Sequence, residues 1–60
     1  MSIDEQIEQA NKSRNEFLRE ALAEDEKAKG SFTMEQFWAW TNYDNANAKV
    51  AELIAKKYNS

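Results

Sequence analysis

Cysteine, histidine and proline are absent from this 60-residue chain, and glycine occurs once, at Gly30. Without cysteine there can be no disulfide framework and no thiol nucleophile. Without histidine the commonest metal ligand and general base are missing. We therefore predict that the protein binds no metal and needs no cofactor. With no proline, the single glycine is the main break and divides the chain into two halves.

Long apolar runs and basic patches are missing as well. No run approaches the roughly 18 residues of a membrane span, and Met1-Ser2-Ile3-Asp4 does not resemble a signal peptide, so we expect a cytoplasmic protein. Residues 1–29 carry eight acids against five bases, and residues 30–60 carry three of each, which gives a net charge of −3. This balance argues against nucleic-acid binding driven by phosphate contacts.

Motifs that carry catalytic chemistry are also scarce. The acids Glu16, Glu20 and Glu24 recur four residues apart on the polar side of a predicted helix, where a solvated face is the ordinary interpretation. Carboxylate metal sites in helical bundles use Glu-x-x-His, which this chain cannot form. A chain this short also leaves little room for a substrate pocket. We predict that the protein is not an enzyme.

The first half is predicted to form a helix over about residues 3–28. Ser2 and Glu5 fit a capping box, and Gly30 can take the left-handed position after the last turn. An apolar stripe recurs at helical spacing, with Leu18 and Leu22 on its flank. The stripe consists of Ile3, Ile7, Ala10, Phe17, Ala21 and Ala28.

A second capping box, Ser13-x-x-Glu16, leaves open a break in this helix near residues 11–13. The run SRNEFLREAL, residues 13–22, resembles the second helix of ribbon-helix-helix repressors and antitoxins. That resemblance implies a DNA-binding regulator. In that family, however, a DNA-reading strand and a first helix precede this point, and twelve residues cannot supply both.

The second half begins with a strong helix start. Thr33 and Gln36 fit a capping box, and Phe32 and Phe37 are placed to pack on each other across it. We predict a helix over about 34–42 whose buried stripe contains Met34, Phe37, Trp38 and Thr41. The stretch TNYDNANAK, 41–49, is rich in residues that favour turns and caps. We therefore favour a break at 42–44 and a last helix over about 45–58, with a single helix over 34–58 as the alternative.

Four residues are candidates for a protein interface. Trp40 projects about 110° from the predicted stripe, so it either covers a flank of the neighbouring helix or anchors a partner. Trp38, on the stripe, and Tyr43, beyond it, complete the aromatic set. Arg14 lies near the centre of the first stripe, where its stem can run to solvent or its guanidinium can meet a carboxylate across an interface.

Two classes of function fit these observations. The first is a non-enzymatic protein-binding module, such as a small regulator, inhibitor or accessory factor; phages and mobile elements encode proteins of similar composition. The alternative is a small DNA-binding regulator in which 34–58 forms a helix-turn-helix. In that case Asn45 and Asn47 could read bases and Lys49 could contact a phosphate.

The predicted fold is a single all-α domain, 1–60, of two to three helices in a helical-hairpin or three-helix arrangement. Of 25 hydrophobic residues nine are alanine, so 16 larger ones must cover every helix face. This is a thin core for a lone chain of 60 residues. We expect homodimerisation to complete it.

Overall fold

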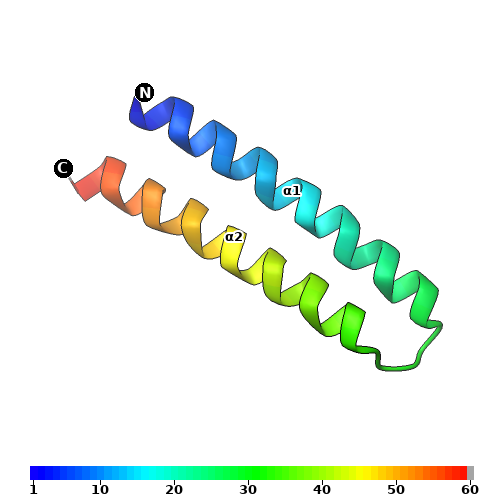
Figure 1. Cartoon of the computed structure of the whole chain (residues 1–60). Helices are drawn as coiled ribbons and strands as arrows, with labels where there is room; N and C mark the ends of the chain where they lie inside the picture. The colour runs from blue at the N-terminus through cyan, green and yellow to red at the C-terminus, as the bar shows by residue number, and fades with distance from the viewer. Residues whose placement is uncertain (60) are drawn as a thin grey trace.

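The computed structural model describes residues 1–59 and contains two α-helices packed side by side as an antiparallel hairpin (Figure 1). Helix α1 spans Ile3–Ala28 and helix α2 spans Met34–Asn59. The loop of residues 29–33 joins them at one end of the molecule, and both termini lie at the other end. The predicted all-α fold is therefore confirmed, in its helical-hairpin form.

Helix α1 begins and ends where the sequence predicts. The Glu5 amide donates to the Ser2 hydroxyl at 3.2 Å, and the Ser2 amide donates back to the Glu5 carboxylate at 3.4 Å, so two otherwise unpaired amides are satisfied. At the other end Lys29 and Gly30 both have positive φ, 49° and 86°. The helix is continuous through residues 11–13, so the second capping box is not used.

Helix α2 is one helix of 26 residues, and the favoured break at 42–44 was wrong. Thr41 satisfies its hydroxyl inside the helix, by donating to the Phe37 carbonyl at 2.9 Å. Asn42 and Asp44 face solvent, where polar side chains need no special turn. Tyr43 turns toward α1 rather than to the polar side, because the face that α2 buries is not the one predicted.

The two helices meet along positions that alternate at spacings of three and four residues. This is the heptad pattern of coiled coils, whose letters a to g we assign from the half-buried and buried residues. In α1 the a and d positions are Ile3, Ile7, Ala10, Arg14, Phe17, Ala21, Glu24 and Ala28. In α2 they are Gln36, Ala39, Tyr43, Ala46, Val50 and Leu53, and the same spacing reaches Lys57, which is exposed. We call these two rows the seam. Its buried members are Ala21, Ala39, Val50 and Leu53.

The prediction of which face of α2 is buried was therefore wrong. Met34, Phe37 and Trp38 lie at heptad positions f, b and c, on the outer face, and are exposed. The reason is the length of the helix. Over its first turns the most apolar stripe is the aromatic one, but beyond Thr41 that stripe continues with Asn45 and Glu52. Only the row through Tyr43, Val50 and Leu53 can contact α1 over all 26 residues.

Polar contacts join the helices at three levels of the hairpin. Lys57 Nζ lies 2.6 Å from Asp4 Oδ1, Arg14 Nη1 lies 3.5 Å from Asn47 Oδ1, and Gln36 Nε2 donates to Asp25 Oδ1 at 2.5 Å. Each step of ten or eleven residues along α1 is matched by an equal step back along α2. Because every link requires the same alignment, the three together select one register of the hairpin.

Candidate functional site

The most distinctive surface lies where α2 begins. The Gln36 backbone N–H donates to the Thr33 hydroxyl at 3.1 Å, and the Thr33 backbone N–H donates to Gln36 Oε1 at 3.4 Å. The predicted capping box is therefore confirmed. The Phe32 and Phe37 rings on either side of it lie 6.5 Å apart, as expected for a residue pair that brackets a helix start. The box thus fixes the direction in which the loop delivers Phe32.

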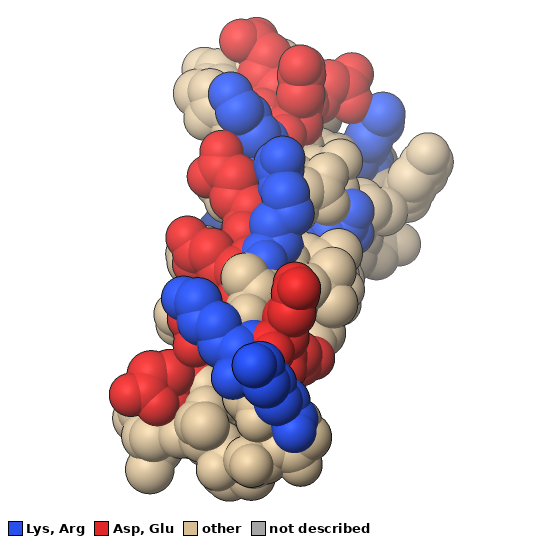
Figure 2. Space-filling model, turned by 90° about the vertical axis from the view of Figure 1, so that its right-hand side faces the viewer, with Lys and Arg blue, Asp and Glu red and all other residues tan. Residues whose placement is uncertain are grey.

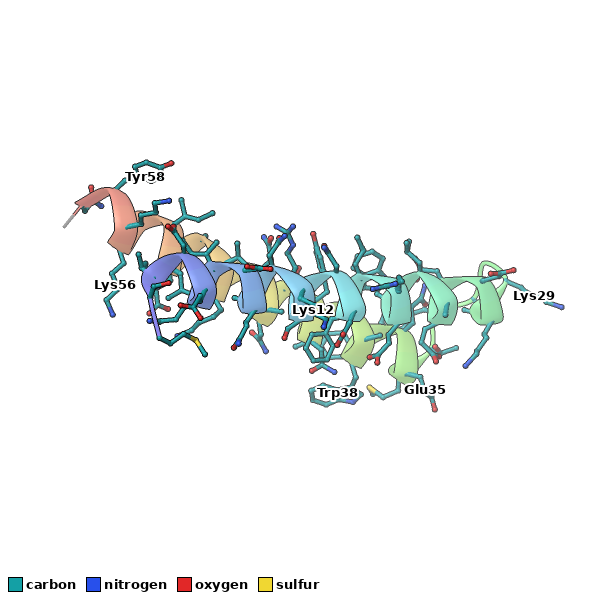
Figure 3. The ribbon with its side chains drawn as sticks, turned by 90° about the horizontal axis from the view of Figure 1, so that it is seen from above. Lys12, Lys29, Glu35, Trp38, Lys56 and Tyr58 are labelled. Atoms are coloured by element: carbon teal, nitrogen blue, oxygen red, sulfur yellow. The ribbon has the colours of Figure 1, made fainter. Side chains whose placement is uncertain are left out.

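Phe32, Met34, Phe37 and Trp38 form one exposed group, which we call the loop-end aromatic patch. Phe32 is 78% exposed, Met34 62% and Trp38 56%, and the Phe37 and Trp38 rings pack edge to face at 5.4 Å. Figure 3 shows the Trp38 ring standing clear of both ribbons. In Figure 2 the lowest part of the molecule, which is the loop end, is largely uncharged, whereas acidic and basic side chains interleave above it.

A shallow groove of about 260 Å³ runs beside this patch. Phe32, Phe37 and Trp40 supply its aromatic lining, and Asp44 is its one carboxylate. The full lining is Phe32, Gln36, Phe37, Trp40, Thr41 and Asp44. The groove is open and mostly apolar, with one carboxylate at its margin, which is the arrangement that receives an apolar side chain from another protein.

Trp40 itself is anchored between the helices. Its Nε1–H donates to Asp25 Oδ1 at 2.9 Å, the same oxygen that accepts from Gln36. These two hydrogen bonds, that from Trp40 first, lower the pKa of Asp25 from its ordinary 3.8. The Trp40 ring also packs edge to face on Tyr43, with centroids 5.6 Å apart.

The four residues predicted to form an interface differ in burial and do not form one surface. Trp40 covers a flank of the neighbouring helix and is half-buried, and Tyr43 is half-buried in the seam. Arg14 also lies in the seam, where it meets Asn47 and Asn15 rather than a carboxylate. Trp38, predicted to be buried, is the member of the set that is exposed to solvent.

The residues named for DNA binding do not head a recognition helix. Asn45, Asn47 and Lys49 lie in the middle of the continuous helix α2, and the Asn47 side chain accepts from Arg14. Within residues 1–59 there is also no strand of the kind a ribbon-helix-helix protein requires. The helix-turn-helix geometry on which the DNA-binding alternative depended is absent from that part of the chain.

Sequence reasoning missed three features of the site: the exposure of Phe32 and Phe37, the inclusion of Met34 in a surface patch, and the role of Asp25. A heptad assignment carried from Lys57 back to Gln36 would have placed Phe37 and Trp38 outside the seam. No comparable signal marks Asp25, because its partners come from the other helix.

Fold and surface define the class as an α-helical hairpin with a solvent-exposed aromatic patch at its loop. No family model, no curated protein and no solved structure matches the chain. Neither helix, over the described residues 1–59, holds an apolar stretch sufficient to cross a bilayer.

Proposed function

We propose that this protein is a non-enzymatic protein-binding module, a small regulator or accessory factor, that self-associates and engages another protein through the loop-end aromatic patch. The observation that carries the proposal is the exposure of Trp38 and Phe32 on a helix start held by a capping box. Contiguous exposed apolar surface of this kind is typical of interaction sites.

Two further features support the patch as a docking surface. Its rings are held in place before any partner arrives, because Phe37 packs on both Phe32 and Trp38. A preorganised aromatic surface loses little side-chain entropy on binding. The adjacent groove offers a recess beside Phe32 and Phe37, and Trp38, which packs on Phe37, is of a residue type enriched at hot spots.

The test uses Trp38→Ala with Lys56→Ala as its control. Residues 38 and 56 are eighteen apart, which is five helical turns, so both side chains leave the same face of α2 at opposite ends. Figure 3 shows Trp38 and Lys56 pointing to the same side. Tagged wild type and both variants are used to capture proteins from the native host, and the binding of any retained protein is then measured with purified components.

We expect the wild type and Lys56→Ala to retain a common partner. Trp38→Ala should bind it at least 30-fold more weakly, as expected for a hot-spot residue worth about 2 kcal/mol. Equal binding by all three proteins would contradict the proposal, as would a partner that depends on Lys56 rather than Trp38.

A further inference from the structure

The hairpin exposes more surface than a compact protein of its mass. Its accessible area is 4618 Å², whereas a compact monomer of 7.0 kDa exposes about 4,000 Å². Its radius of gyration is 13.8 Å, against about 10 Å for a compact chain of 60 residues and about 14 Å for one of 120. The hairpin thus has the radius of gyration of a compact domain with twice as many residues. Its additional accessible surface of roughly 600 Å² approaches the area that each partner buries in a standard interface.

The two long sides of the hairpin differ in character. In an antiparallel pair the e positions of both helices lie on one side of the seam and the g positions on the other. The g side holds the charges Glu20, Lys27, Glu35, Lys49 and Lys56. The e positions, by contrast, carry Leu18, Trp40 and Ile54 and two charged residues, Asp4 and Asp25. We call the e side, together with the adjoining b positions, the charge-poor side. Its b positions add Leu22, Phe37, Ala51 and Tyr58, with Glu8 and Asp44 as their charged members.

Several of these side chains remain uncovered in the hairpin. Leu22 is 52% exposed, Ile54 40% and Tyr58 76%, and they are distributed from the loop half to the terminal half of the molecule. Figure 3 shows Tyr58 on the side opposite to Lys56, Glu35 and Trp38, which separates this surface from both the charged side and the exposed Trp38. The charges that do occur at e positions, Asp4 and Asp25, are already engaged by Lys57, Gln36 and Trp40.

We infer that the charge-poor side is the interface with a second copy of this chain, and that two hairpins pack side by side as a four-helix bundle. This rests on the self-association included in the proposed function and assigns it to a surface. A symmetric dimer places the same side of each copy in contact. Interface centres are depleted of charged residues. Burying the e positions covers two carboxylates that already have partners within the hairpin, with Glu8 and Asp44 at the edge, whereas burying the g positions would desolvate five charged side chains. The dimer also leaves Trp38, which lies on the side opposite to Tyr58, free for a different protein.

The test is sedimentation equilibrium of full-length protein from 1 to 500 µM, with Leu22→Glu and Ile54→Glu compared with Lys49→Glu. All three residues are exposed in the hairpin, so each variant should retain its helical circular dichroism. We expect a wild-type dimer, at least a 100-fold weaker dimer for Leu22→Glu and Ile54→Glu, and less than a threefold change for Lys49→Glu.

Because the chain lacks cysteine, single-cysteine variants provide a second readout that does not depend on destabilising the dimer. Ala51→Cys on the charge-poor side should be joined to its symmetry mate by a short bismaleimide, and Asn42→Cys on the opposite side should not. A dimer broken by Lys49→Glu or cross-linked through Asn42→Cys would overturn the assigned surface while leaving self-association intact. A wild type that stays monomeric at 500 µM would overturn self-association itself, without bearing on capture through Trp38.

Discussion

Asp25 joins two half-buried residues of α2 that differ in role. Gln36 caps the start of that helix and Trp40 covers the flank of α1, and both donate to one carboxylate oxygen. The two tryptophans of α2 therefore have different roles. Trp40 contributes to the fold through the first of its two predicted roles, covering a flank of α1, whereas Trp38, predicted to be buried, is exposed to solvent.

This division predicts different costs for two similar substitutions. Trp40→Ala removes a half-buried ring and leaves Asp25 without one donor, so it should lower the free energy of unfolding by about 2 kcal/mol or more. Trp38→Ala removes an exposed ring and should change it by less than about 0.5 kcal/mol. Urea denaturation of both variants measures the difference, and the reverse order would show that α2 is rotated from the orientation described.

Two titrating groups should limit stability at opposite ends of the pH range. The pKa of Asp25 is lowered by the hydrogen bonds from Trp40 and Gln36. Its contribution to the free energy of unfolding is therefore complete above about pH 3.8 and is lost as the pH falls through the pKa of the folded state. The pKa of Lys57 is raised above 10.5 by its hydrogen bond to Asp4 and by the charge of that carboxylate. Its contribution is complete below pH 10.5 and is lost as the pH rises through the folded-state value.

Urea denaturation across pH checks both limits. Asp25→Asn should flatten the acid limb of the stability curve and leave the alkaline limb unchanged, and Lys57→Gln should do the opposite. An acid limb that is identical in wild type and Asp25→Asn would mean that the carboxylate does not hold Trp40 in solution.

Because helix α2 is continuous, replacing Asp44 should change the free energy of unfolding in the opposite direction from the one expected if the helix broke there. Asp44 is exposed in the middle of the helix, where aspartate is less favourable than alanine. Asp44→Ala should therefore raise the free energy of unfolding by about 0.5 kcal/mol. If Asp44 instead capped a separate third helix, the same change would lower it by about 1 kcal/mol. Thermal and urea denaturation give the sign directly, with Asn45→Ala as a neighbouring control that should also stabilise.

Helix α1 also has polar residues in the face that contacts α2. Arg14 occupies an a position, and Glu24 occupies a d position. A two-helix seam leaves both side chains only half-buried, so Arg14 can extend across to Asn47 at a site open to solvent. Such groups add little stability, but together with the links at Asp4 and Asp25 they disfavour a hairpin shifted by one turn.

At the scale of the whole molecule, the hairpin measures 44 × 15 × 12 Å over its Cα atoms. Side-by-side pairing through the charge-poor side doubles the mass while the long dimension stays near that of one hairpin. Small-angle X-ray scattering of the dimer should therefore give a maximum dimension about equal to that of a single hairpin with its side chains. A dimer joined end to end through the loop-end aromatic patch would be nearly twice as long, and that result would contradict the side-by-side arrangement.

Helix ends were determined by the sequence alone. The Ser2–Glu5 and Thr33–Gln36 boxes and the single glycine act between residues at most a few positions apart, so their outcome does not depend on the rest of the fold. The bounds predicted for the first helix, and the start of the second, agree with the structure for this reason. The all-α class follows from the same local signals.

The face that each helix buries was decided only by the tertiary structure. For α2, the first turns favour an aromatic stripe through Phe37 and Trp38, while the whole helix favours the row through Tyr43, Val50 and Leu53. Burial is shared along the full contact between α1 and α2, so the row that can pair over every turn prevails over the locally more apolar one. The rings left outside the seam, Phe32, Phe37 and Trp38, became the candidate binding surface because the contact between the two helices did not use them.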